Sequence, residues 1–217
     1  MSGRILSLEE ARAFYDRFGS GQDLQKFFED PAINVLVEHS MFEGADSVVE
    51  LGCGTGRVAE RLLREKLGPR TTYIGFDISR TMVDLARVRL RPWRQRARIE
   101  LTEGTPKLPL PDGACDRFLS TYVLDLLGEE QIVATLHEAR RVLAVHGRLC
   151  LASLTFGQST VSNLVCGLSR WIHSVSPRLV GGCRPLRLDT FMGADWHVLH
   201  REVVCAFGVC SEVLIAN

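Results

Sequence analysis

The stretch VVELGCGTGRVAERLL, residues 48–63, decides the fold. A short apolar run ends in Glu50 and Leu51, and three glycines follow at alternate positions, Gly52, Gly54 and Gly56, before an amphipathic helical pattern begins. A buried strand, a glycine turn and a helix in this order make the first unit of an α/β sheet. Glycines let the backbone take unusual dihedral angles and approach a ligand closely. We therefore expect a ligand at this turn, beyond the carboxyl end of the strand.

Strand-like and helix-like segments alternate as far as residue 154. We expect strands at 47–51, 71–78, 97–104, 115–124 and 147–154, and helices at 56–67, 79–93 and 129–143. This alternation predicts parallel pairing. Two further strand-like runs, 196–207 and 209–217, have almost no connection between them and must pair antiparallel. The expected fold is α/β, a doubly wound, mostly parallel seven-stranded sheet closed by a C-terminal antiparallel hairpin.

The segments outside this alternation predict the rest of a single domain spanning 1–217. Residues 7–18 and 22–40 have helical patterns, with Ser7 and Glu10 forming a capping box, and are too small to bury a core of their own. We therefore expect 1–40 to be a helical cover over a ligand-binding core at 45–155. The irregular insert 156–193, with Leu164, Leu168 and Trp171 on one helical face, is predicted to be a lid and acceptor pocket before the hairpin at 196–217. An insert that merely packs on the sheet is an equally consistent interpretation.

Composition excludes several classes of protein. The 217 residues include 26 basic and 26 acidic side chains, and this balance argues against a nucleic-acid partner. The sequence has neither a transmembrane-length apolar run nor the apolar core of a signal peptide, so we expect a cytoplasmic protein. The seven cysteines form no C-x-x-C pair and are expected to be reduced core residues. The sequence contains no cluster of metal-ligating residues, so we expect no metal site.

Two classes of cofactor compete for the glycine turn. A dinucleotide fingerprint, G-x-G-x-x-G, requires its third glycine where Arg57 stands. The Glu50 carboxylate would repel a pyrophosphate but attract an ammonium group. Asp77, at the end of the second strand, could accept hydrogen bonds from ribose hydroxyls of either cofactor.

Four segments in order, VELGCGTGRVAERL, YIGFDIS, LPLPDGACDRFLSTYVLDLL and EARRVLAVHGRLCL, resemble the class I S-adenosylmethionine-dependent methyltransferases of the UbiE-like small-molecule type. The resemblance extends over about residues 45–155 and includes the C-terminal hairpin. It implies S-adenosyl-L-methionine as the cofactor. The implied cradle for its methionine part is Glu50, Gly52, Cys53, Gly54, Thr55 and Gly56.

The same resemblance implies contacts for the rest of the cofactor. Asp77 would bind the ribose hydroxyls, Ile78 and Met82 would pack on the adenine, and Ser120 would lie beside the sulfonium. The segment Glu103-Gly104-Thr105 matches the family's adenine-binding turn, but Gly104 stands where the family commonly has an aspartate.

Three side chains are candidates for catalysis. Tyr122 and Asp125 follow the fourth strand, where the family places groups near the acceptor, and Tyr15 lies where members often lay an N-terminal helix over the cofactor. Their structural alternatives are a packing aromatic, a solvated acid and a core aromatic.

The end of the fourth strand also bears on the acceptor. It reads STYV in place of the (N/D)-P-P-(Y/F) of enzymes that methylate exocyclic amines of bases. We expect a small-molecule or lipid-like acceptor, no nucleic acid, and peripheral contact with a membrane at most. Two alternatives remain: a non-catalytic S-adenosylmethionine-binding protein that acts through a partner, and a nicotinamide-dependent oxidoreductase.

Overall fold

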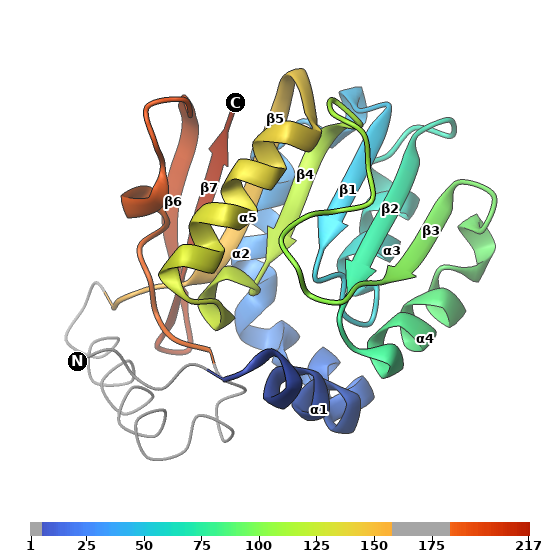
Figure 1. The fold of residues 1–217 in the computed structure, drawn as a ribbon, viewed down its shortest axis with the longest axis horizontal. Coiled ribbons are helices and arrows are strands. Elements are labelled where there is room, and N and C mark those ends of the chain that lie inside the picture. Colours follow the sequence, from blue (N-terminus) through green and yellow to red (C-terminus); the bar gives the residue numbers. More distant parts are fainter. Residues whose placement is uncertain (1–5, 158–182) are drawn as a thin grey trace.

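A computed structural model describes residues 6–157 and 183–217 (Figure 1). The described strands form one seven-stranded sheet in the order β3-β2-β1-β4-β5-β7-β6. Strands β1 to β5 are parallel, and β7 runs antiparallel to both of its neighbours. The predicted fold class is therefore confirmed. The strands are β1 (Ser47–Leu51), β2 (Thr72–Asp77), β3 (Ala97–Leu101), β4 (Cys115–Thr121), β5 (Leu143–Leu154), β6 (Val198–Ala206) and β7 (Val209–Ala216).

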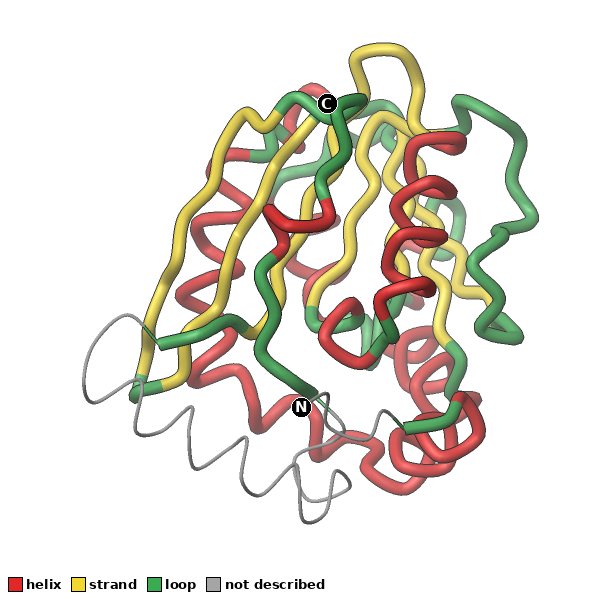
Figure 2. The backbone as a smooth tube through the Cα atoms, turned by 60° about the vertical axis from the view of Figure 1, so that its left-hand side comes forward, coloured by secondary structure: helices red, strands yellow, loops and turns green. Residues whose placement is uncertain are grey.

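Helices cover both faces of the sheet (Figure 2). One face packs against α2, α3 and α4, and the other packs against α5 and the segment that leads to β6. The alternation of the strands explains this layering, because Val48 and Val49 of β1 enter opposite cores. The helices are α1 (Leu8–Phe18), α2 (Lys26–His39), α3 (Arg57–Glu65), α4 (Arg80–Arg89) and α5 (Glu129–Val142), with short 3₁₀ helices η1 (Gly19–Gln25), η2 (Phe42–Gly44), η3 (Arg91–Trp93), η4 (Leu124–Leu126) and η6 (Leu188–Phe191).

The N-terminal segment divides into two parts with different surroundings. The predicted capping box is present, because Ser7 Oγ accepts from the Glu10 N–H and the Glu10 carboxylate accepts from the Ser7 N–H. Helix α1 and η1 lie at the carboxyl ends of the parallel strands (Figure 1). Helix α2 instead buries Ile33 and Leu36 against the sheet. The cover predicted for 1–40 thus involves two different kinds of packing.

The predicted insert is only partly within the described residues. Its apolar positions Leu164, Leu168 and Trp171 lie outside them. Residues 183–188 pass along the edge of α5 and lead into η6. Their backbone bonds to the core, since the Leu186 N–H donates to the Leu154 carbonyl over 3.0 Å.

The C-terminal hairpin corrects the expectation for two cysteines. Cys205 and Cys210 face each other across β6 and β7 and form a disulfide. The prediction of reduced thiols is wrong for this pair because the tight turn places the two positions directly opposite each other. It holds for Cys53, Cys115 and Cys150, which are free and buried. No helix among the described residues is long and apolar enough to cross a membrane.

Arg117 of β4 holds the end of α2 against the sheet. Its buried guanidinium donates to the carbonyl of Ser40 over 2.8 Å and to that of Met41 over 2.7 Å. Met41 has φ of 53°, so the chain turns sharply at this point.

We expect Arg117→Ala to destabilise the protein by about 2–4 kcal/mol, because it leaves these buried carbonyls without donors. Urea unfolding followed by circular dichroism measures this change. Arg98→Ala is the control: its side chain is 73% exposed, and the loss should stay below about 0.5 kcal/mol. Equal losses for the two variants would contradict this account of Arg117.

Candidate functional site

A cavity opens between the carboxyl ends of β1, β2 and β4 and the N-terminal segment of α1 and η1. It has two lobes that share Gln22, Gly52, Thr121 and Tyr122. The larger lobe, of about 120 Å³, extends toward α1, α4 and the loop after β3, and the smaller lobe lies under the glycine loop. This is the position at which open α/β sheets bind their ligands.

The glycine loop bends tightly from β1 onto β2. The N–H groups of Gly52 and Cys53 both donate to the Phe76 carbonyl, over 2.7 and 3.0 Å. Gly52 has φ of 74°, and a β-carbon there would lie 2.1 Å from the Val123 side chain. A β-carbon on Gly54, which has φ of 51°, would lie 2.7 Å from Gln22 Oε1. Both positions therefore require glycine.

Asp77 is held at the centre of the larger lobe. Its carboxylate accepts from the Gly54 N–H and from the Ser79 N–H, each over 2.9 Å. Burial raises the pKa of this carboxyl above its ordinary value, and the backbone hydrogen bonds oppose the shift. Each oxygen retains a free lone pair, so Asp77 can still accept from two hydroxyl groups of a ligand.

Glu50 lies at the base of the smaller lobe, with Cys53 and Thr55. Its carboxylate accepts a hydrogen bond from the Tyr73 hydroxyl. Burial raises the pKa of Glu50 to about 7. A cationic group in this lobe would favour the ionised form.

Gln22 of η1 is a site residue that no sequence pattern indicated. It lines both lobes, and its Oε1 is buried without a hydrogen-bond partner. An orphaned buried acceptor costs free energy unless a ligand supplies a donor. The residues of the cavity thus fit a ligand that brings an ammonium or hydroxyl group to the glycine loop.

Of the five residues predicted to contact the adenine, four line the larger lobe and one does not. Ile78, Met82, Gly104 and Thr105 line the larger lobe. The Glu103 side chain is exposed and lines a neighbouring surface groove. A β-carbon on Gly104, with φ of 83°, would lie 2.4 Å from a methyl group of Leu8. Helix α1 therefore fills the space that an aspartate would need.

Ser120, predicted to lie beside the sulfonium, lines neither lobe. Ser120 is buried inside the sheet, where its hydroxyl donates to the Leu51 carbonyl over 3.1 Å. Thr121, the next residue, lines both lobes. Adjacent strand residues point to opposite faces, and a motif fixes such positions only to within one residue.

Tyr15 and Tyr122 lie in the same cavity, from α1 and from the turn after β4. The Tyr122 hydroxyl is 3.0 Å from Ser211 Oγ of β7. The Tyr122 backbone has φ of 56°, a left-handed conformation. Burial raises the pKa of both phenols above the ordinary value. Both side chains are therefore neutral hydrogen-bonding groups.

Asp125 of η4 is fully buried next to this cavity, 0% exposed. Its carboxylate oxygens have no well-formed hydrogen bond within the described part of the chain, and the nearest donors are the backbone N–H groups of Asp125 and Leu154 and the Cys183 thiol. Burial raises the pKa of Asp125 to about 7. The structural alternative for Asp125, a solvated acid, is thus contradicted by its burial, and the carboxyl can exchange a proton near neutral pH.

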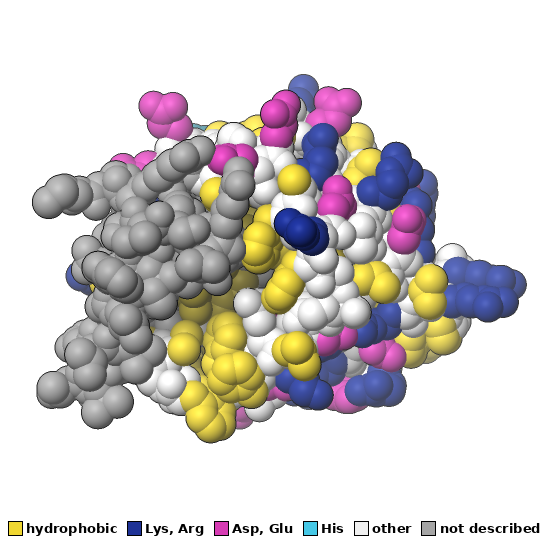
Figure 3. Space-filling model, turned by 90° about the horizontal axis from the view of Figure 1, so that it is seen from below, with side chains coloured by type: hydrophobic (Ala, Val, Ile, Leu, Met, Phe, Trp, Pro, Cys, Tyr) yellow, Lys and Arg dark blue, Asp and Glu magenta, His cyan; other side chains and the backbone are white. Residues whose placement is uncertain are grey.

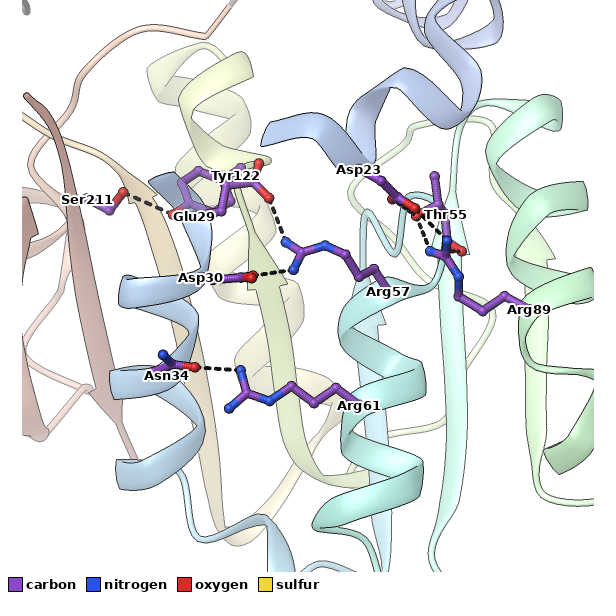
Figure 4. Close-up of polar contacts among 10 residues, drawn as sticks. All are labelled: Asp23, Glu29, Asp30, Asn34, Thr55, Arg57, Arg61, Arg89, Tyr122 and Ser211. Carbon is purple, nitrogen blue, oxygen red and sulfur yellow. Dashed lines mark hydrogen bonds and ion pairs between the residues drawn. The ribbon is translucent and has the colours of Figure 1, made fainter. Parts of the chain in front are cut away.

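Two arginines tie the N-terminal segment to the glycine loop (Figure 4). Arg57 follows Gly56 and binds Glu29 over 2.8 Å, as well as Asp30. Arg89 of α4 binds Asp23 and donates to the Thr55 carbonyl over 3.0 Å. These partly buried ion pairs hold η1 and the start of α2 beside the cavity.

The comparisons with curated proteins point to one kind of domain. Residues 48–147 match the family model described as methyltransferase domain. The chain is 26% identical over 136 residues to tRNA N(3)-cytidine methyltransferase METTL2 of Danio rerio, covering 60% of this chain and 38% of that protein. It is 28% identical over 156 residues to an uncharacterized methyltransferase of Oceanobacillus iheyensis, covering 68% and 65% of the two chains. The chain therefore spans less than two thirds of the length of these relatives.

Solved structures share the fold at low sequence identity. The [4+2]-cyclase SpnF has a TM-score of 0.73 at 16% identity, with 100% of this chain and 98% of that chain covered. Geranyl diphosphate C-methyltransferase from Streptomyces coelicolor, solved with Mg²⁺, geranyl diphosphate and S-adenosyl-L-homocysteine, has a TM-score of 0.67 at 15% identity, with 87% and 79% covered. A complex of the Haloferax volcanii Trm112 methyltransferase activator and a putative methyltransferase has a TM-score of 0.72 at 16% identity, with 95% and 96% covered.

Residues 48–147 thus match a methyltransferase domain, and these matches, with one similar structure solved with S-adenosyl-L-homocysteine, imply S-adenosyl-L-methionine as the cofactor. They do not single out the UbiE-like type. A cyclase among the similar structures shows that this fold alone does not fix the reaction.

Asp125 should make stability depend on pH. Its pKa rises from 3.8 to about 7 on folding, so the folded state binds the proton more tightly and loses stability as pH rises between these values. Asp125→Asn should therefore gain stability relative to the wild type from pH 5 to pH 8, by at most about 1.4 kcal/mol per pH unit.

Urea unfolding at several pH values measures this difference. Asp84→Asn, at a side chain that is 64% exposed, is the control and should run parallel to the wild type. Parallel curves for Asp125→Asn and the wild type would show that Asp125 is ionised and well solvated in the folded protein.

Proposed function

We propose that the protein transfers a methyl group from S-adenosyl-L-methionine to a small, largely apolar acceptor, either a free small molecule or a lipid-like one. The methyltransferase domain match supports the donor. One structural observation carries the choice of acceptor: a row of aromatic side chains that leads from the surface to Tyr122 in the cavity.

The cavity has the groups that this cofactor needs. Asp77 would accept from the ribose hydroxyls, and Glu50 and Gln22 would face the ammonium group of the methionine part. Ile78 and Met82 offer an apolar wall for the adenine. When bound, the cofactor supplies an electrophilic methyl group on a sulfonium, with a neutral leaving group. The residues of the chain have to align the acceptor with that methyl group and exclude water.

The aromatic row begins at the turn of the C-terminal hairpin. Phe207 is 78% exposed, and its ring centroid lies 5.5 Å from that of Phe27, which is 56% exposed. The Phe27 ring lies 5.1 Å from Phe28, and the Phe28 ring lies 6.4 Å from Tyr122. Seen from the carboxyl ends of the parallel strands, apolar side chains gather on this face (Figure 3). Exposed aromatics beside a binding site favour an apolar molecule, or the surface that carries it.

Asp125 and Tyr15 are the proposed polar groups of the acceptor side. A carboxyl with a pKa of about 7 can take a proton from an acceptor hydroxyl, thiol or amine at neutral pH. The buried, neutral Tyr15 would orient the acceptor by hydrogen bonding, and Tyr122 would keep the adjoining wall in place through Ser211. The proton ends on the Asp125 carboxylate as the methyl group forms its new bond.

Two other interpretations are tested by the same experiments. The name of the Danio rerio relative gives a tRNA cytidine as its acceptor, and the Haloferax volcanii methyltransferase was solved in complex with an activator protein. The net charge of zero does not favour a polyanionic acceptor. A non-catalytic S-adenosylmethionine-binding protein would bind the cofactor and methylate nothing.

Asp77→Ala should weaken S-adenosylmethionine binding at least tenfold, about 1.4 kcal/mol, because charge-assisted hydrogen bonds to the ribose are lost. Isothermal titration calorimetry measures the affinity. Asp84→Ala on the exposed side of α4 is the matched control and should bind as the wild type does. Unchanged affinity in Asp77→Ala would remove this carboxylate from the cofactor site.

A screen with labelled S-adenosylmethionine should find turnover with apolar hydroxyl, thiol or amine compounds, presented free or in lipid vesicles, and none with tRNA. For the acceptor found, Phe27→Ser and Phe207→Ser should each raise KM severalfold without changing cofactor affinity, because the apolar approach is lost. Val145→Ser, at an 88% exposed position at the start of β5, is the control.

Three results distinguish the alternatives. Methylation of tRNA alone would overturn the proposed acceptor. Cofactor binding without turnover on any acceptor would favour the non-catalytic interpretation. Turnover that is insensitive to both phenylalanine changes would place the acceptor route elsewhere.

A further inference from the structure

Two imidazole rings and a carboxylate meet where the end of α2 lies against β6, on a part of the molecule remote from the cofactor cavity. One ligand atom from each of His39, His200 and Glu202 lies within 4.8 Å of the other two. The rings of His39 and His200 stack with centroids 3.7 Å apart and an angle of 9° between their planes. His39 is the last residue of α2, and the other two residues belong to β6.

One of these three ligand atoms is buried without a hydrogen-bond partner. His200 Nε2 is buried and makes no hydrogen bond, although the Glu202 carboxylate is 3.3 Å away. The two groups are therefore close but do not point at each other in hydrogen-bond geometry. A buried ring nitrogen without a partner costs free energy that a shared third partner would recover.

We propose that His39, His200 and Glu202 form a Zn²⁺-binding site that joins α2 to the edge strand β6. Two imidazole nitrogens and one carboxylate oxygen are a donor set typical of Zn²⁺, with a fourth position left for water. Zn²⁺ bonds of about 2.0–2.1 Å set tetrahedral donor atoms roughly 3.4 Å apart. The ligand atoms lie within 4.8 Å of one another, so the stacked rings have to turn out of parallel for both nitrogens to face one ion.

The local backbone supports the arrangement. His200 and Glu202 are two residues apart on a strand and therefore project from the same face. His39 stands at the carboxyl end of α2, where the helix dipole favours a cation.

Charged groups around the site influence its affinity for the metal ion. The Arg148 guanidinium donates to the His39 carbonyl over 3.2 Å and places one positive charge nearby. Arg201, which separates the two β6 ligands in sequence, binds Asp189 and Glu212 and is thereby held on the other face of the strand. Glu38 precedes His39 and is exposed, which adds a negative charge at the same helix end.

The proposed site lies at an edge of the sheet. β6 is the last strand in the order and pairs with β7 on one side only, within the described residues. A metal bridge to α2 would hold this strand in register, and stability would then depend on the metal concentration.

Calorimetric titration of tag-free, metal-depleted protein with ZnCl₂ tests the proposal. We expect saturable 1:1 binding, a higher Tm in the presence of Zn²⁺, and weaker binding as pH is lowered, because protons compete for the imidazoles. His39→Ala and His200→Ala should each reduce the affinity at least tenfold and abolish the shift in Tm.

His137→Ala, at an exposed histidine of α5, is the matched control and should bind Zn²⁺ as the wild type does. Circular dichroism of the metal-free variants tests whether they are folded. His39 is exposed, so His39→Ala should disturb the fold less than His200→Ala does. Absence of saturable binding, or binding that survives both histidine changes, would overturn the proposal.

Discussion

The rest of the site depends on one bend of the backbone, in which two successive N–H groups of the glycine loop donate to the Phe76 carbonyl. This double hydrogen bond ties the end of β1 to the end of β2. It brings the Gly54 N–H to Asp77 and lets α3 begin directly after Gly56. Every ligand contact proposed for the larger lobe assumes this geometry. Residues with β-carbons are disfavoured in this bend, because Gly52 and Gly54 both have positive φ and a β-carbon on Gly52 would meet Val123.

The sequence predicted the parts of the molecule that depend on short-range pattern. The strand-and-helix alternation, the glycine loop and the capping box at Ser7 each need only a few neighbouring residues, and the structure contains all of them. Asp77 could be placed because a strand end in a parallel sheet has a defined position relative to its neighbours. Ser120 shows the limit of this reasoning, since a register error of one residue reverses the face.

Features built by residues remote in sequence were not predictable in the same way. Gln22 reaches the loop through the path of η1, which no motif encodes. Leu8 explains Gly104 only once α1 is seen to lie against the loop after β3. The sequence left a solvated acid open as the alternative for Asp125, because burial beneath other elements cannot be read from neighbouring residues. Likewise, Cys205 and Cys210 become a bonded pair only through the turn of the hairpin.

Arg57 has a consequence for how this protein could change its ligand. It stands where a dinucleotide fingerprint has its third glycine, and its guanidinium also holds Glu29 and Asp30 of α2. A mutation to glycine at this position would therefore not lead by a gradual route to a nicotinamide enzyme. It would first remove the ion pairs that hold the start of α2 beside the glycine loop. Position 57 thus combines the residue that departs from the dinucleotide fingerprint with an ion-pair anchor of α2.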